Sequence, residues 1–513
     1  MRRYLALVVA LLLWSAMNVP RIGQPFKLGH DAYVSSQFGA FAYRHATLGL
    51  KMTRGCLLTA IDYEGKPRFY SSYTPFASWL IALPMLFGLT LHTTVRLVTC
   101  LFYILFLISL WAFSRHVWGQ RVANVAVMTA VVLPVSLRYG LSLYWDMSFA
   151  PLFCALALYA SPRPRTVRWA VATGLASTAA ALTHWLSWLL IVPCVVREIR
   201  QGHRKLAATV GAAAVLIPLI VQVSALSVTG VPLSMFLTRV ADRMGATQWQ
   251  GAAPVMGYRQ LLGTFIERMC YSLGPIPFGL MSVVTIVAIV AEMQRDPSLF
   301  PTRRWLFLLW AYALPLGLLA RNLVTYHDMT FYLVPLAAIS TGIAFKWGLD
   351  QPLQGRCRQL AVYSGAFLLL FSVAASGIWP IRASFAPTPD DYATREVART
   401  LALRCRGIQP LVISPGCCAE WPTRATAGPP TDLKARERTV LPALGCLTSK
   451  MGIICYDPSE VPAIAASTRE KGPVLLLARG RELDPLPTMS GQRTIGEYTI
   501  GVYRQHSAAP SRH

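Results

Sequence analysis

Charge is scarce in this sequence, and negative charge is scarcer still. Only 14% of the 513 residues are charged, with 23 Asp and Glu against 48 Lys and Arg. Soluble domains carry about 25% charged residues, so this composition excludes an ordinary soluble domain. With 54% hydrophobic residues and a mean hydropathy of +0.45, it indicates a polytopic membrane protein.

Several familiar catalytic motifs are missing as well. The sequence has no Walker A loop, no GxGxxG that opens a helix after a strand, no HExxH and no GxSxG. The interiors of the apolar runs hold no acids, which proton-coupled transporters need there. No Gly/Pro-broken runs match between two halves, as inverted-repeat transporters require. The net charge of +25 is spread over short loops, so nucleic acid is not an expected partner.

Long apolar runs are what the sequence has in quantity. Runs of bilayer-crossing length predict about eleven spans, of which the fourth and sixth are short. They fall near 4–20, 94–113, 121–139, 147–160, 169–184, 186–197, 206–227, 273–292, 305–320, 329–347 and 359–379. The further run "TPFASWLIALPMLFG" is interpreted as a surface helix, because counting it as a span would invert every later loop.

The basic loops predict the orientation. "MRR", "SRHVWGQR", "SPRPRTVRW", "VREIRQGHRK", "MQRDPSLFPTRR" and "KWGLDQPLQGRCRQ" occur at every second gap between spans. This positive-inside pattern places the N-terminus and these loops in the cytoplasm, where they also attract anionic lipid. The other gaps then face the periplasm or exterior of an inner (plasma) membrane. A cleaved signal peptide is the alternative for the first run, and a retained span is the favoured reading.

The chain changes character after residue 379. We expect a transmembrane domain over 1–379 and a small external α/β domain over 380–513. "PTPDDYATREVARTLA" predicts a helix, and "QPLVISP", "MGIICYD", "GPVLLLARG" and "YTIGVYR" predict strands. An oxidising compartment would allow a disulfide or two among its cysteines. A zinc site is the minor alternative, because adjacent cysteines lack the usual spacing. The cysteines are Cys405, Cys417, Cys418, Cys446 and Cys455.

Polar residues gather on the predicted outer side, mostly at span ends. Together they predict a polar cavity at the outer interface. Each has a simpler explanation: a lone Arg or His is usually an interfacial anchor, the tyrosines suit an aromatic belt, and Asp31 and Asp146 suit helix N-caps. Their shared side favours a functional role. The residues are His30, Asp31, Tyr70, Tyr73, Thr74, Arg96, Arg138, Tyr144, Asp146, His184, Trp185, Glu267, Arg268, Arg321, His327 and Asp328.

An ordered series of motifs resembles the GT-C superfamily of membrane glycosyltransferases, in particular the bacterial branch of protein O-mannosyltransferases and lipid A aminoarabinose transferases. "GHDAYVSSQFGAFAY" resembles the family's first external loop, and "YSSYTPFASWLIALPMLFG" is similar to its closing surface helix. The stretch from "TTVRLVTC" to "LSLYWD" resembles spans two and three with a second acid, and "YHDMTFYLVPLAA" resembles a later His-containing motif. The match covers about residues 1–350 and is strongest in the first 160.

The resemblance implies transfer of a sugar from a polyprenyl-phosphate donor to an acceptor outside the membrane. By matching position, Asp31 would be the general base, acting with inversion at the anomeric carbon, and Asp146 would orient the acceptor. Candidates for binding the donor and its phosphate are Arg96, Arg138, His184, Arg321, His327, Tyr70 and Tyr73. No cofactor is implied beyond the lipid-linked sugar, and no metal is implied, because Asp-x-Asp is missing near Asp146.

The sequence also departs from the family pattern. Ala32 follows Asp31 where a second acid is frequent, and "LTHWLSW" replaces a frequent Thr-Lys-Gly. Two other functions suit the composition. A flippase, ligase or polymerase of envelope polysaccharide would also need external arginines, and would tolerate loss of Asp31. A non-catalytic membrane scaffold would need the C-terminal domain but not the first-loop acids.

Overall fold

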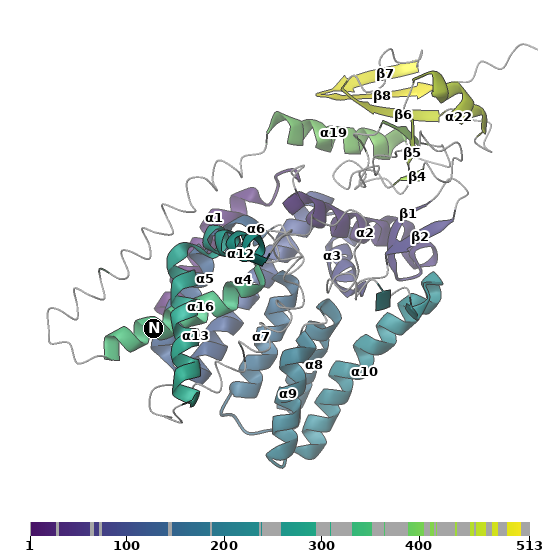
Figure 1. Ribbon diagram of the computed structural model, residues 1–513. Coiled ribbons are helices and arrows are strands. Elements are labelled where there is room, and N and C mark those ends of the chain that lie inside the picture. Colours follow the sequence, from purple (N-terminus) through teal and green to yellow (C-terminus); the bar gives the residue numbers. More distant parts are fainter. Residues whose placement is uncertain are drawn as a thin grey trace, which may run out of the picture. The chain divides into compact units, whose positions relative to one another are not determined.

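The computed structural model describes a discontinuous set of residues. They are 2–26, 30–61, 66–70, 74–141, 146–184, 187–234, 237–238, 258–293, 308, 331–350, 364, 388–404, 411–414, 417, 437–438, 452–455, 458–467, 474–480 and 490–503. The chain divides into two compact units (Figure 1). The helical unit holds Met1–Ile22, Ser72–Ala77 and Arg96–Ala386, and the mixed unit holds Gly23–Ser71, Ser78–Val95 and Pro387–His513.

The helical unit contains the predicted spans. Its helices are η1 (Arg2–Tyr4), α1 (Leu5–Asn18), η2 (Val19–Arg21), most of α4 (Leu91–Trp118), α5 (Gln120–Val132), α6 (Pro134–Tyr139), α7 (Asp146–Ala160), α8 (Val167–Thr183), α9 (Ser187–Arg200), α10 (Arg204–Thr229), α12 (Tyr258–Leu273), α13 (Pro275–Met293) and α16 (Val334–Asp350). Within the described residues, three helices are long and apolar enough to cross a membrane, or four if the bent pair of α12 and α13 forms one span. The expected spans at 305–320 and 359–379 lie almost wholly outside these residues. The others coincide with helices, and their number as spans stays a prediction.

One of the expected spans is interrupted and another begins at a sharp bend, in both cases at residues that cannot continue a helix. The run 121–139 breaks at Leu133, whose ψ of 134° is extended because Pro134 follows it. Gly274, at φ +85°, ends α12. Pro275 then begins α13, and the two axes differ by 114°. Proline and a left-handed glycine therefore account for both changes of direction.

Small residues allow close helix packing in this unit. A Cβ on Gly342 of α16 would lie 2.6 Å from the carbonyl oxygen of Val122 in α5, so only glycine permits this approach. Helix α8 packs against both α7 and α10, and α9 lies beside them (Figure 1). Without a hydrophobic driving force between apolar helices in lipid, such backbone proximity is the usual source of their packing energy.

The predicted basic loops meet at one end of the helical unit, called here the basic end. The Tyr4 ring lies 5.3 Å from that of Trp111 in α4, and Gln120 donates a hydrogen bond of 2.9 Å to the carbonyl oxygen of Arg3. Arg121 forms an ion pair of 3.4 Å with Asp350 at the end of α16. The turns before α8 and α10 join each other through Glu198, described below. The basic loops described by the structure thus share an end, and the side of the membrane on which they lie stays a prediction.

The first part of the mixed unit is formed by the loop after the first span. Helix α2 (His30–Thr53) leads into the antiparallel hairpin of β1 (Leu57–Ile61) and β2 (Pro67–Tyr70). The expected surface helix is α3 (Phe76–Leu86), most of which belongs to this unit. Gly49 breaks the last turn of α2 with a φ of +69°. The hairpin has no counterpart in the sequence prediction.

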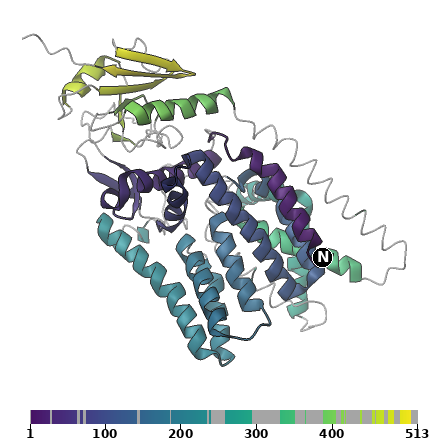
Figure 2. The same cartoon turned by 180° about the vertical axis from the view of Figure 1, so that it is seen from behind.

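The second part of the mixed unit is a six-stranded sheet with strand order β4-β5-β3-β6-β8-β7. The strands are β3 (Leu411–Ile413), β4 (Glu437–Arg438), β5 (Gly452–Ile454), β6 (Val474–Arg479), β7 (Ser490–Ile495) and β8 (Tyr498–Tyr503), and β3 pairs in parallel with β5 and β6. Helix α19 (Pro389–Arg404) covers one face, and α22 (Val461–Ser467) covers the other (Figure 2). The predicted α/β character of this region is confirmed, and β4 and β7 were not predicted.

The cysteines of this sheet are buried apart from one another. Cys417 belongs to the core beneath α19 and Cys455 to the core beneath α22, and they form no disulfide with each other. Cys405, Cys418 and Cys446 lie outside the described residues, so the expected disulfides stay predictions. Among the described residues, no three His, Cys, Asp or Glu side chains gather in a way that could hold a metal ion.

Candidate active site at one end of the helical unit

Two arginines lie together at the end of the helical unit opposite the basic end. Arg96, near the start of α4 and only 7% exposed, donates a hydrogen bond of 2.8 Å to the carbonyl oxygen of Arg21. Arg21 in turn donates to the side-chain oxygen of Asn18 at 3.0 Å and to the carbonyl oxygen of Leu137 at 3.1 Å. The arginine pair, Arg21 and Arg96, thus fixes the end of α6 against the ends of α1 and α4. Two fixed guanidinium groups make this place strongly electropositive.

A histidine and a tyrosine from distant parts of the chain also meet in this unit. His184 follows the last residue of α8 and is buried. Its Nε2 lies 2.7 Å from the hydroxyl of Tyr332, in the short 3-10 turn just before α16. Thr74 donates a hydrogen bond to the carbonyl oxygen of Leu182, two residues before His184. His184 is therefore held from two sides, by Tyr332 and through the end of α8.

A column of aromatic rings links the two polar groups. Trp14, one turn before Asn18, stacks on Tyr103 with ring centroids 3.9 Å apart. Tyr103 lies 6.2 Å from Phe331, and Phe331 stacks on Phe149 at 5.3 Å. The ring of Tyr332 lies 6.0 Å from that of Phe149. Aromatic pairs at such separations attract each other, so these rings stabilise the positions of the arginine pair and of the pair of His184 and Tyr332.

The predicted general base lies in the mixed unit, in the first turn of α2. Asp31 is the second residue of that helix. One face of α2 is fixed at Gly39, where a Cβ would lie 3.0 Å from Val95 and 3.1 Å from Leu91 at the start of α4. The predicted donor-binding residue Tyr70 ends β2, and its ring lies 6.0 Å from Phe41 of α2. The helix that carries Asp31 in its first turn is therefore supported at Gly39 and Phe41.

The C-terminal half of α2 contains a buried histidine, His45, whose pKa is shifted. Its Nδ1 lies 3.1 Å from the hydroxyl of Thr53, which itself donates to the carbonyl oxygen of Gly49 at 2.9 Å. Because the one hydroxyl proton of Thr53 is used, His45 must donate through Nδ1. Its Nε2 is buried with no partner among the described residues. Burial lowers the pKa of His45 from 6.5 to about 4.

The remaining predicted site residues fall into two groups. Arg138 lies in α6 beside Leu137, whose carbonyl oxygen Arg21 binds, and Asp146 is the first residue of α7. Asp31 and Asp146 both lie in the first turn of a helix, and the alternative that they serve as helix N-caps stays open. Outside the described residues lie Tyr73, Arg321 and His327.

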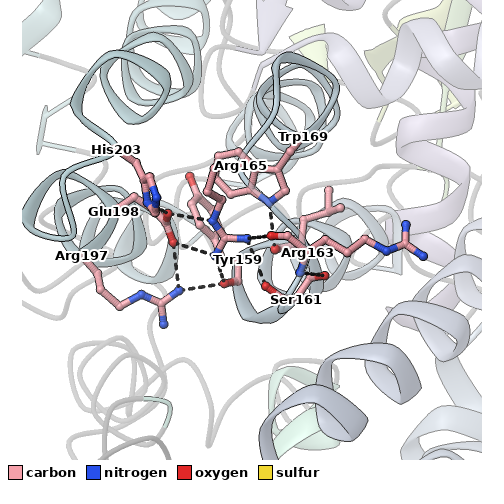
Figure 3. A network of polar contacts seen from close by, with 9 residues as sticks. Tyr159, Ser161, Arg163, Arg165, Trp169, Arg197, Glu198 and His203 are labelled. Carbon is pink, nitrogen blue, oxygen red and sulfur yellow. Dashed lines mark hydrogen bonds and ion pairs between the residues drawn. The ribbon is translucent and has the colours of Figure 1, made fainter.

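A second polar network occupies the basic end (Figure 3). Glu198 of α9 is fully buried and receives two hydrogen bonds from Arg165, of 3.0 and 3.1 Å. His203 and Arg197 lie 3.1 and 3.4 Å from the same carboxylate. Arg165 also donates to the carbonyl oxygens of Ser161 and Tyr159, at 3.1 and 3.0 Å. The network joins the turn between α7 and α8 to the turn between α9 and α10.

Sequence reasoning missed several residues of these clusters, among them Arg21, Tyr332, Glu198 and Arg165. Arg21 follows the first apolar run on the side where arginines are rare by the positive-inside pattern, and that exception was its only signal. Tyr332 lies in an apolar stretch and reads as a belt residue. Glu198 is embedded among arginines and reads as a spacer in a basic loop.

No protein-family model matches the sequence, and no curated protein matches it. Solved structures do match its fold. ArnT from Cupriavidus metallidurans, bound to undecaprenyl phosphate, matches with a TM-score of 0.56 at 13% identity, over 99% of this chain and 98% of that chain. The archaeal oligosaccharyltransferase AglB from Archaeoglobus fulgidus, in complex with an inhibitory peptide and a dolichol-phosphate, matches with a TM-score of 0.56 at 12% identity, over 93% of this chain and 69% of that chain.

A third structure, the same archaeal enzyme tethered to an acceptor peptide, matches with a TM-score of 0.59 at 10% identity, over 93% of this chain and 69% of that one. ArnT and AglB are both membrane glycosyltransferases of the GT-C superfamily. The chain therefore shares the GT-C fold of these two enzymes, as the resemblance in the sequence predicts, and its described part includes helices long and apolar enough to cross a membrane.

Proposed function

We propose that the protein transfers a sugar from a polyprenyl-phosphate donor to an acceptor outside the cytoplasmic membrane, with inversion at the anomeric carbon. The observation that carries this proposal is the match to ArnT along nearly the whole of both chains. That structure holds undecaprenyl phosphate, and the AglB structure holds a dolichol-phosphate. Both ligands join a polyprenyl-type lipid to a phosphate, which is the donor chemistry expected here.

The arginine pair supports the same proposal. The polyprenyl phosphate is the leaving group, and its phosphate gains negative charge as the bond between its oxygen and the anomeric carbon breaks. A fixed cation stabilises that charge most where water is sparse. Arg96 is buried, and backbone carbonyls hold both guanidinium groups in place. We assign Arg21 and Arg96 to the donor phosphate, with Arg138, Arg321 and His327 as further candidates.

Asp31 is proposed as the general base. Its carboxylate would take the proton of the acceptor hydroxyl as that oxygen attacks the anomeric carbon. General-base catalysis of this kind is worth about 10²–10⁴ in rate. Placement in the first turn of α2 stabilises a negative charge, which is the form that accepts a proton. Asp146 is proposed to orient the acceptor, and no metal is part of the proposal.

The test compares Asp31→Asn with the wild-type chain in nanodiscs, using a panel of radiolabelled polyprenyl-phosphate sugars. Donor binding is measured on the same samples. Asp390→Asn is the matched control, because Asp390 is likewise the second residue of a helix, α19, and is exposed. We expect Asp31→Asn to keep donor binding and to lose transfer by about 10²–10⁴-fold.

The other outcomes discriminate between functions. Equal transfer by wild type and Asp31→Asn would remove the assignment of Asp31 and leave that residue as a helix cap. Donor binding with no transfer by the wild-type chain, for any sugar in the panel, would favour a flippase, ligase or polymerase of envelope polysaccharide.

A further inference from the structure

The basic end of the helical unit carries exposed cations that the proposed reaction does not use. They lie in the turn between α7 and α8 and around the turn between α9 and α10, and they define a cationic patch. Its members are Arg163, Arg168, Arg197, Arg200, Arg204 and Lys205. From 161 to 205 the sequence contains one acid, Glu198.

That single acid does not neutralise the patch. Glu198 is fully buried, and its two oxygens are bound by Arg165, whose side chain is only 12% exposed. The charges of Arg165 and Glu198 therefore neutralise each other. Figure 3 shows the side chain of Arg163 extending away from this network, while its backbone N–H donates to the hydroxyl of Ser161 at 3.3 Å. The network fixes the backbone. Arg197 of the patch also lies 3.4 Å from Glu198, and the other five members are exposed cations outside that ion pair.

Exposed apolar stripes begin next to these cations on the same helix faces. On α8, Arg168 precedes Val171 and Leu175 at helical spacing, and these two are 56% and 68% exposed. On α9, Arg200 lies one and two turns beyond Val196 and Val192, both exposed. Lys205 is the second residue of α10, on which Leu216 and Ile220 are exposed. On α8, α9 and α10, exposed apolar side chains therefore lie next to exposed cations of the patch.

We propose that the cationic patch binds the head groups of anionic phospholipids in the leaflet next to the basic end. Phosphodiester oxygens accept hydrogen bonds from guanidinium groups, and acyl chains would follow the apolar stripes of α8 and α9. A soluble acidic partner would account for the cations but not for the aliphatic side chains beside them. Because the patch is at the end opposite the arginine pair, this lipid is distinct from the proposed sugar donor.

The test uses the purified full chain in neutral detergent and phosphatidylglycerol as the anionic probe, with phosphatidylcholine as the neutral one. Native mass spectrometry gives the apparent affinity for each lipid. We expect a preference for phosphatidylglycerol, and the triple variant Arg163→Gln, Arg200→Gln, Arg204→Gln should lose it. An interfacial Lys or Arg contributes about fivefold to anionic lipid affinity, so three removals should weaken binding by about a hundredfold. Raised salt should reduce the wild-type preference.

The matched control removes the same charge elsewhere. Lys51→Gln, Arg259→Gln, Arg399→Gln takes away three exposed cations outside the patch and should keep the preference. All six positions are exposed, so neither variant disturbs a core. Equal phosphatidylglycerol affinity of the two triple variants would overturn the proposal. The proposal would also be overturned if the wild type bound phosphatidylglycerol and phosphatidylcholine equally. If such a protein bound heparin or polyglutamate, the partner of the patch would be an acidic macromolecule instead.

Discussion

The hydroxyl of Tyr332 and Nε2 of His184 lie 2.7 Å apart, although 148 residues separate them in the sequence. Both side chains are buried, so the hydrogen bond fixes the imidazole ring against the start of α16. It joins the end of α8 to the segment before α16. Tyr332 therefore orients the imidazole ring of His184, which is a predicted donor-binding residue.

Tyr332→Phe removes this hydrogen bond and keeps the ring contacts. Leaving a buried polar atom with one partner fewer costs about 1–3 kcal/mol, so the free energy of unfolding should fall by that amount. If His184 helps to hold the donor, kcat/KM for the donor should fall by about tenfold. Thermal unfolding in detergent and the transfer assay measure the two effects. Tyr4→Phe, which alters a half-exposed ring at the basic end, should leave both unchanged.

The arginine pair can be tested by a double-mutant cycle on donor affinity. Arg96→Gln and Arg21→Gln should each weaken donor binding by about tenfold, because each removes a fixed cation. The double variant should weaken it by less than the product, since Arg96 holds the backbone of Arg21. Arg121→Gln is the control, because Arg121 forms an exposed ion pair at the basic end. Strictly multiplicative effects would contradict the structural coupling of the pair.

The sequence predicted the elements whose signal is local. Long apolar runs place α4, α8 and α10 correctly, and short apolar runs bounded by Gly, Pro and Asp predict β3, β5, β6 and β8. Pro134 was a local signal for the break at Leu133, but the apolar run 121–139 continues through it and was interpreted as one span. The hairpin of β1 and β2 was missed because "LLTAI" and "PRFY" are short and lie within a polar loop.

The site was harder to predict, because it depends on contacts between distant residues. Asp31, Arg96 and His184 could be selected from their positions at span ends, and the fold gives partners to Arg96 and His184 within the helical unit. Tyr332 carries no local mark of its role, since only the fold brings it to His184. The same holds for Glu198 and Arg165, which are 33 residues apart. A single sequence contains such pairs without identifying them.

Glu198 and Arg165 make a prediction about stability. Glu198→Gln leaves the charge of Arg165 largely buried and uncompensated, which typically costs about 3–5 kcal/mol. The double variant Glu198→Leu, Arg165→Met should regain most of this loss, because it removes both charges. Thermal unfolding of the full chain in detergent measures both changes. Asp350→Asn breaks the exposed pair with Arg121 and should change the free energy of unfolding by less than about 1 kcal/mol; an equal loss in Glu198→Gln and Asp350→Asn would contradict this account.

His45 predicts how stability depends on pH. Burial lowers its pKa from 6.5 to about 4, so between these values the unfolded chain binds a proton that the folded chain does not. The stability that His45 contributes is therefore complete above about pH 6.5, falls as the pH drops towards 4, and then stays low. The total loss is about 3 kcal/mol, at roughly 1.4 kcal/mol for each unit of pKa.

His45→Gln keeps a donor for the hydroxyl of Thr53 but cannot titrate, so its unfolding free energy should fall less steeply over this range. Curves for the two proteins that stay parallel between pH 7 and 4.5 would show that His45 is not protonated on unfolding. Because the comparison is between two proteins that differ only at this residue, titration of every other group cancels.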